Sequence, residues 1–541
     1  MLKRKQYEAT YAGYVYEKPV THWTASEKVK TCLTKVDLST DIIKEGGFPI
    51  ISNGKTSYID AKDGHTAIIA SSGMKKSVCC FMPLILCLAK AGENMVITDP
   101  KGELFNRTAG FLKKCGYKVL CLDFRTMDKD CFNILHYPAT VYRSGENDRG
   151  LSLLSDIIST LAEPQRQHSK DPFWPDTATL WMNGTGSIMF DAFPKIEQIN
   201  VLNWSDFNVR ESASMIDEHL LSMMPDNTVK SALKQCLSSA ENTFKSILIT
   251  ASSFLSMFNQ NPKLAAMLSH STFTLEDLQT PKTALFLVTD DTTSTADPIL
   301  GMIISQIQSF LVDKAYHTTS GKLETRMNFV LDEFASIPIP DMDRSLATHR
   351  SRGIRYYLCI QSLALLKERY KNPEKLLSNC TSTLYLGSTE LELLNELETK
   401  LGKTCITPDG KERPLCSKAE LMMLEKAWDY KEAIYMNLSE GIRYCTMLPS
   451  IESYGLGDCP TPVYSVELPE IDTYNVAQFV TDVVNEKIHV PFVSHQKNFL
   501  RRKKNKQSQT EHLSDDQYSA GKLEEELMKK FEQLFGTCDE D

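Results

Sequence analysis

Residues 66–86 read "TAIIASSGMKKSVCCFMPLIL", which is a short apolar run, a polar loop and a longer apolar run. A buried β-strand, a loop and a buried helix produce this pattern. The loop lies where nucleotide-binding proteins carry the phosphate-binding sequence G-x-x-x-x-G-K-[ST]. Lys76 and Ser77 match its last two positions, but Ala70 and Lys75 occupy the two glycine positions. The stretch therefore predicts a phosphate loop without its glycines.

The two matching side chains are those that do chemistry. A lysine here contacts the terminal phosphates as a point charge, and a serine hydroxyl ligates Mg²⁺. The missing glycines would let the backbone wrap around the phosphates, partly at positive φ, which costs other residues about 1 kcal/mol or more. A strand-to-helix turn with solvated lysines is the alternative for this stretch taken alone. We expect the following residues to bind ATP: Ala70, Ser71, Ser72, Gly73, Met74, Lys75, Lys76 and Ser77.

A second motif is "MNFVLDEFAS" at residues 327–336, an apolar strand that ends in Asp332 and Glu333. In nucleoside triphosphatases an aspartate in this place orients Mg²⁺, and the glutamate polarises the attacking water. The alternative is a strand followed by acidic residues at a helix start, where carboxylates favour the positive end of the helix dipole. We expect Asp332, with Ser77, to hold Mg²⁺ and Glu333 to be catalytic.

Two further features lie around "IRYYLCIQS" at residues 354–362. Gln361 ends this predicted strand and is placed to sense the γ-phosphate or to position water, although a simple strand cap is the alternative. Arg350 and Arg352 precede the strand on a predicted helix end. In a ring of subunits such an arginine reaches the nucleotide of the next subunit, whereas in a monomer it is a solvated charge. These three residues complete the predicted catalytic set.

The remaining pattern predicts an α/β fold. Short runs rich in β-branched or aromatic residues suit a mostly parallel sheet that is buried on both faces, and helical stretches separate several of them. From about 151 to 278 only helical segments occur, which indicates an all-helical insertion. The runs are "TAII", "NMVITD", "KVLCLDF", "TALFLVTD", "MNFVLDEF", "IRYYLCIQS" and "STLYLG".

Composition limits the function classes. The 541 residues are 42% hydrophobic and 24% charged, as in a soluble globular protein, and the net charge of -9 argues against a surface that binds nucleic acid all over. The 15 cysteines are scattered without a CxxC pair, which indicates reduced thiols rather than a metal site. No run of about 18 apolar residues and no signal peptide is found. We expect a cytoplasmic chain.

Several ordered motifs resemble those of TraG-type coupling proteins of type IV secretion and bacterial conjugation, relatives of the FtsK and HerA motors. They are spread from about residue 22 to 448. The signature "DPKGEL" at 99–104 follows the first helix, and the other motifs are "GFPI" at 47–50, "DPFW" at 171–174, "LDEFAS" at 331–336, "THRSRGIRYYLCIQSLALLKERY" at 348–370 and "LLSNCTSTLYLGSTELELLNELETKLGKTCI" at 376–406.

The resemblance implies a RecA-like nucleotide-binding domain with an inserted all-α domain, assembled as a hexamer at the cytoplasmic face of the bacterial cell membrane. Such proteins receive relaxase-bound single-stranded DNA and deliver it to the secretion channel with ATP hydrolysis. By the same resemblance Lys76 and Ser77 match the phosphate loop, Asp332 and Glu333 the second nucleotide motif, and Gln361 the sensor.

The expected domains follow from the pattern along the chain, and the resemblance identifies the nucleotide-binding and all-α domains among them. They are an N-terminal segment with a hairpin at Asn53-Gly54 (1–60), the first part of the nucleotide-binding domain (61–150), a helical region with the all-α insertion (151–278), the second part of the nucleotide-binding domain (279–458), and a linker with the basic run "RRKKNK" and an amphipathic helix (459–541).

Two departures from the family pattern leave alternatives open. Family members usually begin with transmembrane helices, so this chain is expected to dock on a membrane-anchored partner, to be a soluble subtype, or to be incomplete at its N-terminus. The family loop normally carries both glycines. The predicted function is therefore an ATP-driven coupling protein, with a non-hydrolysing adaptor that recruits the substrate or a partner ATPase as the alternative.

Overall fold

The computed structural model describes residues 21–485, apart from 223, 225–226, 291, 293, 406–411, 456–458, 462–463 and 465–469. No helix in this part of the chain is both long enough and apolar enough to cross a bilayer. The basic run at 501–506 and the predicted amphipathic helix at 520–536 lie outside the described residues, so both stay predictions.

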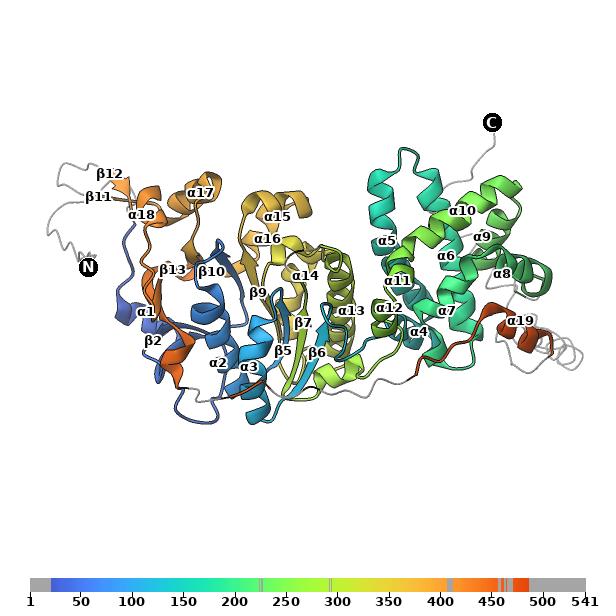
Figure 1. Ribbon diagram of the computed structural model, residues 1–541. Coiled ribbons are helices and arrows are strands. Elements are labelled where there is room, and N and C mark those ends of the chain that lie inside the picture. The colour runs from blue at the N-terminus through green and yellow to red at the C-terminus, as the bar shows by residue number, and fades with distance from the viewer. Residues whose placement is uncertain are drawn as a thin grey trace, which may run out of the picture.

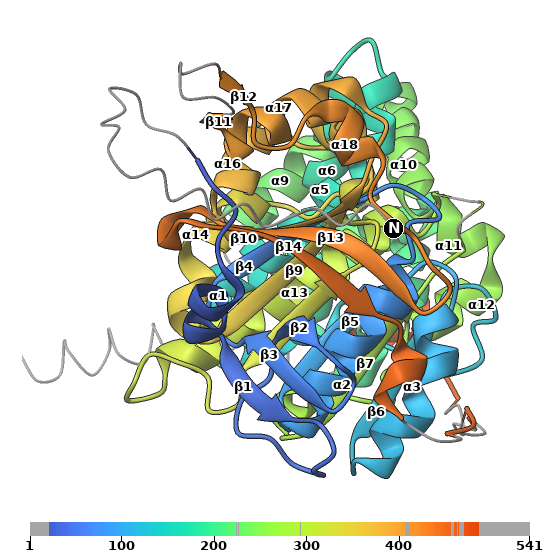
Figure 2. The same cartoon turned by 90° about the vertical axis from the view of Figure 1, so that its left-hand side faces the viewer.

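A large sheet forms the centre of the protein (Figures 1 and 2). Its strands in the described residues are β4 (His65–Ala70), β5 (Asn94–Asp99), β6 (Lys118–Asp123), β7 (Thr283–Val288), β8 (Met327–Leu331), β9 (Ile354–Ile360), β10 (Cys380–Gly387), β13 (Tyr430–Asn437) and β14 (Ile442–Pro449). They lie in the order β14-β13-β10-β4-β9-β8-β5-β7-β6. The strands from β10 to β6 run parallel, whereas β13 and β14 add an antiparallel edge.

Both faces of this sheet are covered. Along β4, Ile68 and Ala70 join one apolar core, and Ala67 and Ile69 join the other, because side chains of a strand alternate between faces. The first core contains helices α2 (Met82–Lys90) and α3 (Glu103–Lys114) and a small sheet, and the second contains α13 (Asp297–Tyr316). The predicted α/β class with a mostly parallel sheet is confirmed.

The small sheet consists of β1 (Thr34–Asp37), β3 (Thr56–Asp60) and β2 (Phe48–Ser52), in that order and antiparallel. The turn between β2 and β3 contains Asn53 and Gly54, where the sequence predicted a hairpin, and Gly54 has the positive φ of 89° that glycine tolerates. The antiparallel strands β2 and β3 thus form a hairpin at this position. Helix α1 (Ser26–Cys32) precedes β1.

A helical body lies beside the sheet, on the right of Figure 1. It follows β6 and precedes β7, and no strand occurs among the described residues between them. The helical insertion in the predicted fold class is thus present. Its helices are α4 (His136–Arg143), α5 (Asn147–His168), α6 (Phe173–Ala192), α7 (Val201–Ser205), α8 (Arg210–Met215), α9 (Thr228–Leu237), α10 (Glu241–Phe254), α11 (Ser256–Gln260) and α12 (Pro262–Met267).

Helix α19 (Val476–Val484) joins this body from the C-terminal segment, as Figure 1 shows. The main-chain N–H of Val476 donates to Asp206 at 2.7 Å, and the ring of Phe479 lies 5.1 Å from that of Phe193. This helix lies in the segment that was expected to be a linker, where no helix was predicted. The other elements are α14 (Met342–His349), α15 (Leu363–Arg369), α16 (Pro373–Ser378), α17 (Leu391–Leu401), β11 (Lys403–Cys405), β12 (Glu412–Pro414) and α18 (Lys418–Met422).

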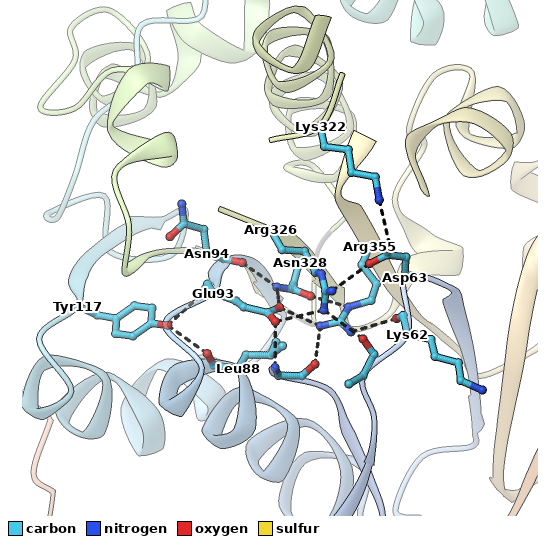
Figure 3. Close-up of polar contacts among 12 residues, drawn as sticks. Lys62, Asp63, Leu88, Glu93, Asn94, Tyr117, Lys322, Arg326, Asn328 and Arg355 are labelled. Carbon is cyan, nitrogen blue, oxygen red and sulfur yellow. Dashed lines mark hydrogen bonds and ion pairs between the residues drawn. The ribbon is translucent and has the colours of Figure 1, made fainter. Parts of the chain in front are cut away.

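A buried ionic network joins the amino ends of the strands to the N-terminal segment (Figure 3). Arg355 of β9 is 1% exposed and donates to Glu93 at 2.9 Å, to Asn328 at 2.8 Å and to the carbonyl of Gly46 at 3.2 Å. Glu93 also accepts from the main-chain N–H of Gly46 and from Asn328, both at 2.9 Å, and pairs with Arg326 at 3.2 Å. Each charged group of this network is compensated by a partner of opposite charge. Removal of one partner therefore leaves another charge uncompensated.

We predict that Glu93→Gln lowers the free energy of unfolding by about 3 kcal/mol, because it leaves the Arg355 guanidinium buried without its counter-charge. The matched control Lys367→Met removes the exposed pair with Glu392 and should change it by less than about 1 kcal/mol. Urea unfolding followed by circular dichroism measures both. Equal losses in the two variants would contradict the structural role of the network.

Candidate nucleotide site

Three predicted motifs meet at one edge of the sheet. Strands β4, β9 and β8 are neighbours and parallel, so their carboxyl ends lie together. The loop at 70–77 follows β4, Gln361 follows β9, and Asp332 and Glu333 follow β8. Ligands of open α/β sheets bind at this edge. The topology thus brings together residues that are far apart in the sequence.

The phosphate loop leaves the sheet at Ala70, which is fully buried and pairs with Gly387 of β10. The N–H of Ser71 donates to the carbonyl of Gly387 at 3.0 Å. Gly73 has a φ of 76° and Lys75 a φ of 59°. Lys75, at the second glycine position of the motif, therefore adopts the left-handed conformation for which glycine is preferred. One turn of π-helix, η1 (Ser77–Phe81), follows and continues into α2.

Lys76 extends from this loop to the end of β8. Its ammonium lies 2.7 Å from Asp332 and 3.5 Å from Glu333, and its side chain is 13% exposed. Burial acts to lower the pKa of Lys76, but the neighbouring acidic groups Cys359, Asp332 and Glu333 raise it overall. Burial also raises the pKa of Asp332, against the opposing charge of Lys76. The ammonium at 2.7 Å favours the ionised carboxylate and so opposes the effect of burial on this pKa.

Glu333 and Gln361 form a second contact in the site. The side-chain amide of Gln361 donates to Glu333 at 2.8 Å. Glu333 has a φ of 55°, which turns its backbone away from the strand direction. The hydroxyl of Thr98, at the end of β5, donates to the carbonyl of Asp332 at 2.8 Å and so fixes this turn from the other side. Thr98 is a positioning residue that the sequence analysis missed.

The two predicted arginines lie far in space from the other site residues. Arg350 and Arg352 form a single 3₁₀ turn immediately before β9, whereas Gln361 lies immediately after it. A strand of this length spans roughly 20 Å. Neither arginine therefore reaches Glu333 or Lys76 of its own chain, and only a contact with another subunit is compatible with the predicted catalytic role.

The motif "DPKGEL" forms the turn between β5 and α3. The carboxylate of Asp99 accepts from the N–H of Phe105 at 2.8 Å, and burial raises its pKa to about 6. Gly102 has a φ of 70°, and the guanidinium of Arg125 lies 2.5–2.8 Å from where a Cβ would be. Arg125 in turn donates to Asp123 at 2.9 Å. The positive φ favours glycine here, and any larger residue would also require the Arg125 side chain to shift.

A cleft of about 300 Å³ opens beside Glu333, at the carboxyl ends of β5 and β7. Its lining is dominated by hydroxyl and carboxylate groups, and burial raises the pKa of Asp297 in it to about 6. No sequence motif marks this cleft, because its lining comes from three separate segments of the chain. The polar lining residues are Thr98, Thr289, Asp290, Thr292, Ser294, Asp297, Asp332, Glu333 and Ser336.

The donor set near the loop fits a magnesium nucleotide. Ser77 and Asp332 are the predicted ligands, a hydroxyl and a carboxylate. Within the described residues no group of three or more histidine, cysteine, aspartate or glutamate side chains is placed to hold a metal ion. Mg²⁺ in triphosphatases is held by one or two such protein groups together with phosphate and water oxygens. Ser77 and Asp332 supply donors of this kind, and their assignment to Mg²⁺ stays a prediction.

The family described as "Type IV secretory system Conjugative DNA transfer" matches residues 21–432, well over half of the chain. The chain belongs to this family. Two conjugal transfer proteins TraG of Escherichia coli are similar to it, 25% and 24% identical over 370 residues. Each alignment covers 64% of this chain and 56% of the relative, so the match spans little more than half of the relatives' length. The recognised TraG-type resemblance is confirmed.

Solved structures of the conjugative coupling protein TrwB have a fold similar to that of this chain. A form of TrwB in complex with sulphate superposes with a TM-score of 0.55 at 15% identity and covers 86% of this chain and 99% of the other. TrwB in complex with ADP and Mg²⁺ gives 0.54 at 14% identity with the same coverage. At such identities the likeness shows the fold.

We predict that Lys76→Met destabilises the protein more at about pH 8 than at about pH 5. The variant leaves Asp332 buried without its counter-charge, so the raised folded-state pKa of this carboxyl rises further above its ordinary 3.8. Such a group contributes stability below its unfolded pKa and loses it as the pH rises through the folded pKa. Melting temperatures at both pH values measure the difference.

The control is the double variant Lys76→Met with Asp332→Asn, which removes both charges. Its melting temperature should show no additional loss at the higher pH. A loss of equal size at both pH values in the single variant would contradict a charged pair between Lys76 and Asp332.

Proposed function

We propose that this protein is an ATP-hydrolysing coupling protein that delivers relaxase-bound single-stranded DNA to the channel of a conjugative type IV secretion system. The observation that carries the proposal is the contact of Lys76 with Asp332 and Glu333 beside the loop at 70–77. Family membership supports the conjugative context.

In the proposed reaction the chain binds the triphosphate through the loop amides and Lys76, whose charge stabilises the phosphate oxygens. Ser77 and Asp332 would hold Mg²⁺, which neutralises phosphate charge when bound. Glu333 orients water for attack on the γ-phosphorus and accepts its proton, while the bond from that phosphorus to the bridging oxygen breaks and ADP leaves. The amide of Gln361, 2.8 Å from Glu333, fixes the orientation of that carboxylate. Each of these groups lies just beyond the carboxyl end of β4, β8 or β9.

The partners in the proposed function are single-stranded DNA, a relaxase, the secretion channel and five further copies of this chain in a hexamer. The location of Arg350 and Arg352 before β9, away from the loop of their own chain, is compatible with contact to a neighbouring subunit's nucleotide in a ring. We propose a place at the cytoplasmic face of the bacterial cell membrane, through a membrane-anchored partner.

We predict that the purified protein hydrolyses ATP and that single-stranded DNA stimulates it. Glu333→Gln should lower the turnover about 100-fold or more, because the general base is lost while the amide retains the contact geometry. Lys76→Ala should weaken ATP binding as well as turnover, because the phosphate charge loses its partner. Phosphate release with and without DNA measures both variants.

The matched control is Glu392→Gln on α17, an exposed glutamate whose only described partner is Lys367, and it should leave turnover unchanged. If the unaltered protein binds ATP but turns over no faster than Glu333→Gln, the enzyme proposal fails. The chain would then act as a non-hydrolysing adaptor. This is the competing function because the loop lacks both of its glycines.

A second prediction concerns the arginines. A chain with Arg350→Ala and Arg352→Ala and a chain with Glu333→Gln should each be inactive alone, yet a mixture should regain up to about a quarter of the normal turnover. The arginine-deficient chain keeps its glutamate and receives arginines from its neighbour. Phosphate release after mixing measures this. A mixture as inactive as its components would contradict a role across subunits.

A further inference from the structure

The turn at residues 424–430, which we name the clamp turn, lies against the phosphate loop. The ammonium of Lys426 donates to the carbonyl of Gly73 at 3.0 Å, and the ammonium of Lys75 donates to the carbonyl of Trp428 at 2.8 Å. Each segment thus supplies a lysine that bonds to the main chain of the other. Both bonds join residues 353 positions apart, so only the fold creates them.

The clamp turn is itself held firmly. Lys431, at the start of β13, is fully buried, and its ammonium donates to the carbonyls of Leu424 at 3.1 Å and Glu425 at 3.2 Å. The N–H of Glu432 donates to the carbonyl of Glu425 at 2.9 Å. The turn therefore moves with the sheet edge and not as a free surface loop.

The sheet also fixes the distance between the two segments. Strand β13 pairs with β10, and β10 pairs with β4, whose last residue Ala70 begins the phosphate loop. The loop is bonded to β10 by the N–H of Ser71 and to the clamp turn by Lys75 and Lys426. The phosphate loop is thus held near its start by β10 and farther along by the clamp turn.

These bonds hold the two loop residues whose backbone is left-handed, Gly73 and Lys75. A lysine at φ 59° is disfavoured relative to glycine, because its Cβ crowds the carbonyl oxygen. The Lys75 side chain compensates through a hydrogen bond that glycine cannot make. The residue that replaces glycine is therefore the same residue that attaches the loop to the clamp turn.

We propose that the clamp turn positions the phosphate loop, and that Lys75 and Lys426 keep its amides in the phosphate-binding conformation that glycines would otherwise permit. Lys426 is a positioning residue, since it acts through the carbonyl of Gly73. The inference rests on the proposed nucleotide binding at this loop.

The test is a double-variant comparison on the whole chain with a fluorescent ATP analogue and Mg²⁺. Lys426→Met should weaken binding about 3- to 10-fold in the natural chain, as expected for the loss of one hydrogen bond that holds the loop. In the Lys75→Gly chain the same change should weaken binding less than about 2-fold, because glycine adopts the loop conformation without support. Lys418→Met, whose partner is Asn395 on α17, is the control and should change nothing.

Two results would overturn the proposal. One is no weakening by Lys426→Met in the natural chain. The other is equal weakening in both chains, which would mean that Lys426 acts on the nucleotide by its charge and not through the loop.

Hydrogen exchange without nucleotide keeps the clamp separable from the proposed function. In the natural chain Lys426→Met should speed exchange of the amides at 71–76 about 3-fold or more, whereas Lys418→Met should not. Unchanged exchange would overturn the clamp even in a protein that binds ATP. A natural chain that binds no ATP would contradict the proposed function, while the exchange result would still decide the role of the clamp turn.

Discussion

The parallel alignment of β10, β4, β9 and β8 is the constraint on which the site depends. Parallel strands place their carboxyl ends at one edge, so the residues that follow them converge although helices and loops separate them in the chain. The ion pair between Lys76 and Asp332 joins residues 256 positions apart and exists only because β4 and β8 both flank β9. The same alignment keeps Arg350 and Arg352 at the opposite edge. One geometric rule thus assembles half of the predicted catalytic set and excludes the other half from the same chain.

The class of the fold could be predicted because its signals are local. The runs that form the parallel strands from β4 to β10 are apolar on both faces, which indicates a sheet that is covered on both sides. Residues 77–90 are mostly apolar, which indicates a buried helix. Strands β13 and β14 were not predicted. Strand β14 forms the edge of the sheet, and its burial is broken by exposed Met447 and by partly exposed positions, so its pattern does not stand out from that of a loop. Strand β13 is mostly buried, and its burial does not explain why it was missed.

The site could be predicted in part, and the division follows the range of the contacts. Lys76, Ser77, Asp332, Glu333 and Gln361 each end a strand or begin a helix, and a local motif marks each of them. Thr98 and Lys426 carry no motif, because their roles arise from hydrogen bonds to main-chain carbonyls supplied by distant segments. Local motifs mark these side chains in the sequence, whereas the conformation of Lys75 depends on the fold around it.

The charge balance of the site also limits how it can be used. An ammonium has three protons to donate, and Lys76 directs its charge at two carboxylates in a setting where only 13% of its side chain is exposed. Donation to phosphate oxygens leaves fewer protons for Asp332 and Glu333. A buried Asp332 whose ammonium turns toward phosphate needs another positive charge beside it, or its raised pKa favours protonation. Under the proposed function, Mg²⁺ bound with the nucleotide would supply this positive charge beside Asp332.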